Sequence, residues 1–110
     1  MHIIIRGHHL SITPAIQQQI HAKFQQMMQH FDQVGTLQIK LRKDHQIDQR
    51  SRKGSANHVA EAIIRLPKAE LFAQASADNM YRSIQKLTQK LEKQLNKYRK
   101  TQQNALLPIG

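Results

Sequence analysis

The segment TLQIKLRK, residues 36–43, constrains the fold most, because its apolar and polar residues alternate without a break. In an extended chain, the apolar side chains of this segment face one side and the polar or cationic ones face the other. The two sets are Leu37, Ile39 and Leu41, and Gln38, Lys40 and Arg42. This period of two predicts a half-buried β-strand with a basic outer face. A sheet that contains it has one apolar face, which a second layer must cover.

Three other segments predict strands. Residues 2–7, HIIIRG, are β-branched and end in glycine, and residues 58–66 and 70–77 are apolar runs joined by a link short enough for a hairpin. Residues 44–55 between the second and third strands are polar and end in Gly-Ser, which favours a loop.

Two segments have the apolar spacing of amphipathic helices. Thr13 is a plausible N-cap and Pro14 suits the first helical position, and we expect this helix to end near Asp32. Its apolar residues are Ile16, Ile20, Phe24, Met27, Met28 and Phe31. The second helix covers residues 79–100, with Asp78 or Ser76 as its cap, and residues 101–110 are expected to form a loose tail.

The predicted order is therefore β-α-β-β-β-α. The first two strands, joined by a helix, can be parallel neighbours, and the last three form an antiparallel meander. Both helices are needed to cover the apolar face. The sequence predicts an α+β two-layer sandwich in a single domain, residues 1–100, with a four-stranded sheet and two helices on one face.

The second helix also has a strongly basic side. At about 100° per residue, its apolar positions fall in one sector and its cations in another. The apolar stripe is Met80, Ile84, Leu87, Leu91, Leu95 and Tyr98, and the cation ridge is Arg82, Lys86, Lys90, Lys93, Lys97 and Lys100. Only one acid, Glu92, accompanies the cations of residues 79–100.

The apolar stripe and the cation ridge together discriminate between several kinds of partner for this helix. The sheet already takes the apolar stripe that a membrane helix or coiled coil would need, and a dimer seam flanked by like charges would repel. A merely solvated face normally mixes charge signs. With a net charge of +10 in the whole chain, the ridge favours RNA or DNA. Lysine favours phosphate contact over base reading, and no aromatic stacking platform on a strand is evident.

Cations outside the second helix can widen the predicted RNA-binding surface. Lys40 and Arg42 point off the sheet, while Arg50, Arg52 and Lys53 lie in the polar loop, where RNA contact and plain solvation are equal alternatives.

The composition excludes several functions. The chain has no cysteine, so thiolate chemistry is excluded, and its seven histidines contain no metal-binding pair at helical spacing. No nucleophile motif or glycine-rich phosphate loop occurs, so we expect neither an enzyme nor a cofactor nor a metal site. No apolar run is long enough for a signal peptide or a membrane span, and a cytoplasmic protein is expected.

The chain resembles the short bacterial ribosome hibernation promoting factors and their ribosome-associated inhibitor relatives. The resembling stretches are IRGHHLSITPAI (5–16), AKF (22–24), HFD (30–32) and NMYRSIQKLTQKLEKQLNK (79–97). The resemblance implies a β-α-β-β-β-α fold that binds the small ribosomal subunit where mRNA and tRNA meet, silences translation in stationary phase and catalyses nothing. It also implies that Lys23, Lys90, Lys93 and Lys97 face rRNA.

The sequence thus predicts an rRNA-binding surface on a chain that is monomeric when free. The predicted RNA-binding residues are Lys23, Lys40, Arg42, Arg82, Lys86, Lys90, Lys93, Lys97, Arg99 and Lys100. The expected partners are the small ribosomal subunit with its 16S rRNA, the 70S ribosome and, for dimerisation of 70S ribosomes, a separate small modulation factor. Three positions, Gln26, Asn79 and Gln85, depart from the family pattern, which usually has a lysine at the first and acids at the other two.

Three alternative functions are compatible with the same sequence features. The chain could keep 70S ribosomes inactive as monomers, as the inhibitor branch does. It could be a self-associating regulatory module that docks through its last helix, or a general nucleic-acid binder without preference for the ribosome.

Overall fold

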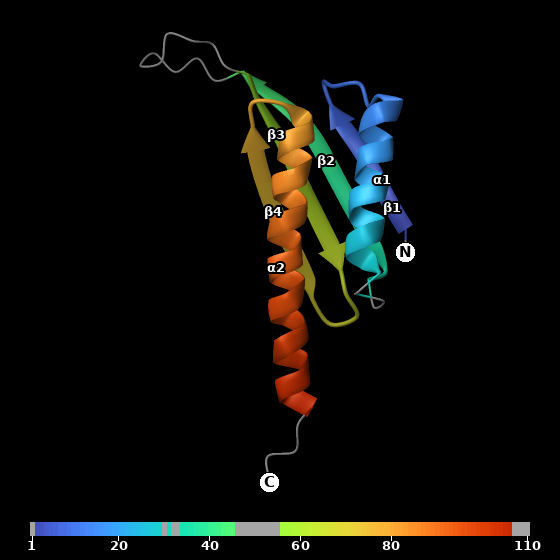
Figure 1. Ribbon diagram of the computed structural model, residues 1–110, viewed down its shortest axis with the longest axis vertical. Helices are drawn as coiled ribbons and strands as arrows, with labels where there is room; N and C mark the ends of the chain where they lie inside the picture. The colour runs from blue at the N-terminus through green and yellow to red at the C-terminus, as the bar shows by residue number, and fades with distance from the viewer. Residues whose placement is uncertain (1, 30, 32–33, 46–55, 107–110) are drawn as a thin grey trace, which may run out of the picture.

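The computed structural model describes residues 2–29, 31, 34–45 and 56–106. Its elements follow the predicted order (Figure 1). They are β1 (His2–His8), α1 (Pro14–Met28), β2 (Thr36–His45), β3 (Ala56–Arg65), β4 (Glu70–Ala77) and α2 (Met80–Leu106). The sheet has the spatial order β1-β2-β3-β4, so β1 and β4 are its edges. β1 pairs with β2 in parallel, and the other neighbours pair antiparallel, as predicted.

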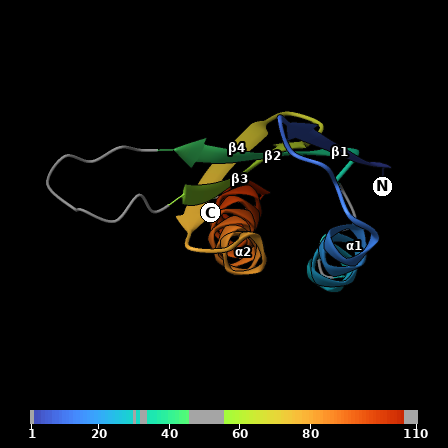
Figure 2. The ribbon, with the colours of Figure 1, turned by 90° about the horizontal axis from the view of Figure 1, so that it is seen from above.

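Both helices cover the same face of the sheet. Viewed from above, the strands form one layer, α1 lies beneath the side of β1, and α2 lies beneath β3 and β4 (Figure 2). No helix among the described residues lies on the opposite face of the sheet, and we call it the open face (Figure 2). The two-layer α+β sandwich predicted from the alternating strand is therefore confirmed.

The core lies between the sheet and the helices, and the period of each element determines which residues enter it. Alternate residues of β2, β3 and β4 point inward, and both helices contribute one apolar stripe each. The largest fully buried side chains include Phe24, Ile20, Met27, Leu37, Ile39, Leu41, Ile64, Ile84, Leu87, Leu91 and Leu95. With no tryptophan in the chain, aliphatic residues supply most of this burial.

α1 begins as predicted but ends early. The side chain of Thr13 accepts a hydrogen bond from the Ile16 N–H at 3.2 Å, and Pro14 takes the first helical position. The helix ends at Met28, ahead of the expected end near Asp32. Phe31 keeps its contact with the core from a tighter turn, in which its N–H bonds to the Met28 carbonyl at 3.1 Å. The apolar periodicity of the sequence therefore continues past the last residue of the helix.

The turn from β1 to α1 requires close backbone packing. A Cβ at Gly7 would collide with the carbonyl oxygen of Leu10, so glycine lets the chain fold back on itself here. His9 follows with a φ of 52°, in the left-handed region.

α2 differs from its predicted bounds at both ends. Its N-cap is Asn79, and not Asp78 or Ser76, because the Asn79 side-chain oxygen accepts from the Arg82 N–H at 2.9 Å. At the other end the helix continues to Leu106, so residues 101–106, which were expected to belong to a loose tail, are helical. Those residues include neither glycine nor proline, and Pro108 is the first helix breaker. Residues 107–110 of the predicted tail lie outside the described residues.

β2 extends into the polar segment 44–55, which was expected to form a loop. Asp44 and His45 still belong to β2 and pair with Asn57 and Ala56 of β3. The rest of that segment, residues 46–55 with its three cations, lies outside the described residues.

Candidate nucleic-acid interface

α2 separates apolar and cationic side chains on opposite sides, as its periodicity predicts. The residues of its apolar stripe from Met80 to Leu95 are buried, and Tyr98 is partly buried. All six residues of the cation ridge are exposed. Because the sheet takes the apolar stripe, the ridge is the side of α2 that remains available to a partner.

α2 contains two buried hydroxyls, and one of them bonds the helix to the sheet. Ser83 is fully buried, and its Oγ donates to the carbonyl oxygen of His58 in β3. Thr88 donates within the helix to the Ile84 carbonyl at 2.8 Å, so its hydroxyl is satisfied without an external partner. The bond to His58 sets the rotation of the helix, and with it the direction of the ridge.

Part of the ridge lies along the free edge of β4. Lys90 donates to the Gln74 carbonyl at 2.7 Å, and Lys86 donates to the Ser76 carbonyl at 3.5 Å. Gln94, in line with them, donates to the Phe72 carbonyl at 2.9 Å. An unpaired strand edge is a template for pairing with another chain, and these side chains cover it. Lys86 and Lys90 therefore have a structural role besides any contact with RNA.

The remaining ridge residues differ in whether an ion pair or hydrogen bond within the chain offsets their charge. Arg82 has Asp78 at 3.6 Å, and both side chains are well exposed, so this ion pair is weak. Lys93, Lys97 and Lys100 are all exposed. Of these, Lys93 and Lys100 make no hydrogen bond or ion pair with any described residue. Lys93 and Lys100 are consequently the clearest candidates for phosphate contact.

Lys23 lies on the helical side of the molecule but not on the ridge. It lines a groove of about 250 Å³ between α1 and α2, opposite the flank of α2 that contains Gln85 and Glu92. The other lining residues are Gln26, Thr88 and Gln89. Two of the positions that depart from the family pattern, Gln26 and Gln85, therefore lie beside Lys23, and the single acid of α2 points away from the ridge.

Arg99 is engaged with an aromatic ring. Its guanidinium carbon lies 5.8 Å from the centre of the Phe31 ring, which is within the range of a cation–π contact. This contact connects the C-terminal part of α2 to the turn after α1, so Arg99 is set apart from the ridge.

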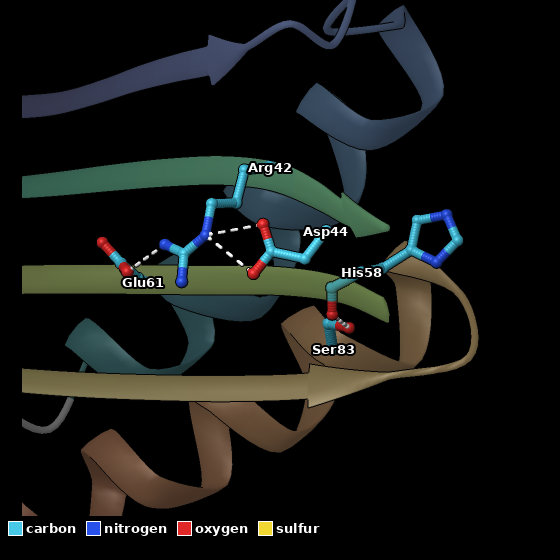
Figure 3. A network of polar contacts seen from close by, with 5 residues as sticks. All are labelled: Arg42, Asp44, His58, Glu61 and Ser83. Atoms are coloured by element: carbon cyan, nitrogen blue, oxygen red, sulfur yellow. Dashed lines mark hydrogen bonds and ion pairs between the residues drawn. The ribbon is translucent and has the colours of Figure 1, made fainter. Parts of the chain in front are cut away.

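Lys40 and Arg42 lie on the open face, on the other side of the sheet from the helices. Arg42 is held by two carboxylates: its Nε lies 3.2 Å from Asp44, and its Nη1 bonds to Glu61 on β3 (Figure 3). The hydrogen bond to Glu61 raises the pKa of Arg42, against partial burial, which lowers it. These carboxylates offset the charge of Arg42, whereas Lys40 is exposed and has no such partner among the described residues.

Two residues of the open face were missed by the sequence reasoning. Phe72 on β4 is 51% exposed, so one aromatic ring lies on the outer side of a strand, where the sequence reasoning singled out none. Arg6 on β1 is exposed and pairs in register with Lys40 of β2. The signal was available, because Leu71, Ala73 and Ala75 alternate with Phe72 and place it on the outer side of β4.

The structure adds two observations about other functions. In the described part of the chain, no group of three or more His, Asp or Glu side chains could hold a metal ion. Over the same residues, no helix is long and apolar enough to cross a membrane.

The fold and the basic helix agree with a family of ribosome-associated proteins. Residues 3–103 match the family model described as "Sigma 54 modulation protein / S30EA ribosomal protein". The chain belongs to this family, and the resemblance to hibernation factors and their inhibitor relatives is thereby confirmed.

Particular relatives carry more specific names. A ribosome hibernation promoting factor of Acinetobacter guillouiae is 67% identical over 102 residues, which cover 93% of this chain and 90% of the relative. That of Escherichia coli K12 is 27% identical, with coverage of 90% and 94%.

Solved structures agree with the fold. A ribosomal subunit interface protein from Coxiella burnetii has a TM-score of 0.75 at 28% identity, over 90% of this chain and 98% of that one. The N-terminal domain of Thermus thermophilus Protein Y has a TM-score of 0.67 at 21% identity, over 89% and 99%, and supports the fold alone.

Proposed function

We propose that this protein is a ribosome hibernation factor. It binds the decoding channel of the small ribosomal subunit through phosphates of 16S rRNA, excludes mRNA and tRNA, and silences translation in stationary phase. It promotes inactive dimers of 70S ribosomes, and no chemical step is involved. The name carried by the relative at 67% identity supports this proposal.

One structural observation carries the proposal: α2 buries its apolar stripe and leaves its cation ridge exposed. Folded RNA presents closely spaced phosphates, and a line of lysines on a rigid helix can neutralise several of them at once. Lysine is a flexible point charge, so such contacts position the protein without reading bases. Once α2 is anchored, the sheet occupies space beside it and excludes other ligands from that space.

The structure also indicates which lysines should be tested. Lys90 bonds to the β4 edge, so replacing it would disturb the fold as well as the charge. Lys93 and Lys100 have no such bond. We therefore choose the double variant Lys93→Glu with Lys100→Glu. The matched control is Lys43→Glu with Lys68→Glu, which makes the same change in net charge at two other exposed positions.

Co-sedimentation with purified 30S subunits at several salt concentrations measures the effect. We expect the ridge variant to lose binding at moderate salt, while the control binds within a few-fold of the unchanged protein. Loss of two phosphate contacts should lower the slope of log affinity against log salt by about 1.4–1.8. If both double variants bind alike, the ridge is not the contact surface.

A sucrose gradient of purified 70S ribosomes with added protein tests dimerisation. A 100S peak that depends on the protein, alone or with a modulation factor, supports the hibernation promoting activity. Ribosomes that bind the protein but remain at 70S support the inhibitor alternative instead. Equal affinity for 30S subunits and duplex DNA in competition would support a general nucleic-acid binder.

A further inference from the structure

The open face of the sheet contains a second surface with a different character from the ridge. An apolar row crosses it, because Ile4, Gln38, Ile63 and Phe72 are successive partners in register from β1 to β4. Ile4 and Ile63 are partly exposed and Phe72 is 51% exposed. None of the three belongs to the group of apolar residues that packs in or against the core. These three side chains therefore add nothing to the core between the sheet and the helices, and they leave apolar surface on the open face.

A pair of like charges lies beside this row. Arg6 and Lys40 are direct partners in the β1–β2 register, on strands that are about 4.8 Å apart. Like charges at facing positions of neighbouring strands repel and destabilise a sheet. The nearest acid by register is Glu61, opposite Lys40, but its carboxylate is bonded to Arg42 (Figure 3). Within the described residues, neither Arg6 nor Lys40 has an ion-pair partner, so an anion bound between them would relieve the repulsion.

The row and the cations meet in a depression. It has a volume of about 130 Å³ and is lined by Ile4, Arg6, Gln38, Ile39, Lys40, Glu61 and Ile63. Its apolar floor lies beside the two cations, and the side-chain amide of Gln38 can both donate and accept hydrogen bonds. Phe72 lies next to Ile63 on the neighbouring strand and continues the apolar surface beyond the depression.

We propose that the open face binds single-stranded RNA. One unpaired base lies on the floor formed by Ile4 and Ile63, its phosphate lies between Arg6 and Lys40, and the adjacent base stacks on Phe72. A cationic site beside an exposed aromatic ring on a sheet is the usual arrangement for unpaired bases, because every base has a face that stacks. This contact goes beyond the ridge proposed above and does not depend on the ribosome.

A second copy of this chain fits the same surface less well. It would bring another Arg6 and Lys40 pair against the first and oppose two chains that each carry a net charge of +10. The apolar row is also interrupted by Gln38. An RNA strand supplies negative charge and flat apolar surface together, so charge complementarity selects it.

Fluorescence anisotropy of the full chain with labelled octamers tests the proposal. The probes are oligo(U), oligo(A) and an octamer of the same charge whose sugars lack bases. Phe72→Ala removes the stacking surface, and Tyr81→Ala is the matched control, because Tyr81 is the other large exposed aromatic, at 47%, and lies on α2. Both side chains are exposed, so both variants should fold, which circular dichroism verifies.

We expect Phe72→Ala to weaken binding of the octamers with bases by about 5- to 150-fold. The variant should leave the baseless octamer unchanged, and Tyr81→Ala should change neither. Arg6→Gln with Lys40→Gln should weaken all three probes and reduce the salt slope by about 0.7 per lost contact.

Amide chemical shifts provide an independent readout. Oligo(U) should shift residues of β1, β2 and β4 as well as α2. Equal binding by Phe72→Ala and Tyr81→Ala, or shifts confined to α2, would overturn the proposal. Self-association that disappears in Phe72→Ala would assign the face to a second copy instead. The open-face variants change different residues from Lys93→Glu with Lys100→Glu. Failure of RNA binding by the open face can therefore be distinguished from failure of ribosome binding by the ridge.

Discussion

Lys90 and Lys93 lie three residues apart on the same helix, and comparing them separates structural and binding roles of the ridge. Lys90 donates to the Gln74 carbonyl at 2.7 Å, whereas Lys93 has no bond to any described residue. Methionine at either position keeps the length and the helix propensity of lysine but removes the charge and the donor. A solvent-exposed hydrogen bond contributes roughly 0.5–1.5 kcal/mol net, so Lys90→Met should lose about 1 kcal/mol of unfolding free energy.

Lys93→Met is expected to stay within about 0.5 kcal/mol of the unchanged protein, as exposed substitutions usually do. Urea denaturation followed by circular dichroism measures both. With a slope of about 2 kcal/mol per M, the midpoint of Lys90→Met should fall by about 0.5 M while that of Lys93→Met hardly moves. Both variants should reduce the salt slope of RNA binding by a similar amount, since each removes one cation. Coincident urea midpoints would refute the idea that Lys90 stabilises the β4 edge.

Two further predictions concern the core and the open face. Leu91→Ala removes a side chain that is 0% exposed and should cost about 2–5 kcal/mol, which a thermal melt detects; a melting temperature equal to that of Lys93→Met would contradict burial of the apolar stripe. Arg42→Met leaves Asp44 and Glu61 without their shared cation and should cost about 1–2 kcal/mol. Because the pKa of Arg42 is raised on folding, its stabilisation is fully present below the pKa of the unfolded chain and is lost only at strongly alkaline pH. The free energy lost in Arg42→Met should therefore be constant in urea titrations from pH 6 to 9. A loss that changes across that window would assign the effect to another group.

The fold was predictable because its main determinants are periodic. The alternation in β2 required a covered face, and two amphipathic segments were available to cover it, which left little choice of architecture. Element ends were less predictable, since they depend on single contacts. Asn79 caps α2 although Asp78 beside it has an equally suitable side chain, and Phe31 continues the apolar period after α1 has ended.

The candidate site was predictable on α2 and much less so on the sheet. Helical spacing alone places the ridge opposite the apolar stripe. Whether a cation on a strand is available depends on register, which links residues far apart in sequence. Arg42 and Glu61 are 19 positions apart yet bonded across β2 and β3, and the sequence shows no trace of that pairing. The outward position of Phe72 was predictable from the alternation of residues 70–77, but the sequence reasoning did not use that alternation.

The cations of this protein differ in whether a partner within the chain already offsets their charge, and this difference bears on specificity. Arg42 is bonded to two carboxylates and Arg82 has Asp78 nearby, so these arginines are partly neutralised within the chain. Lys93 on the ridge, and Lys40 with Arg6 on the open face, have no ion-pair partner among the described residues. Planar arginine is the residue suited to bidentate base recognition, and lysine is a point charge. Binding that relies on the lysines should therefore depend strongly on salt and weakly on base sequence, and any preference for unpaired bases must come from the apolar row beside them.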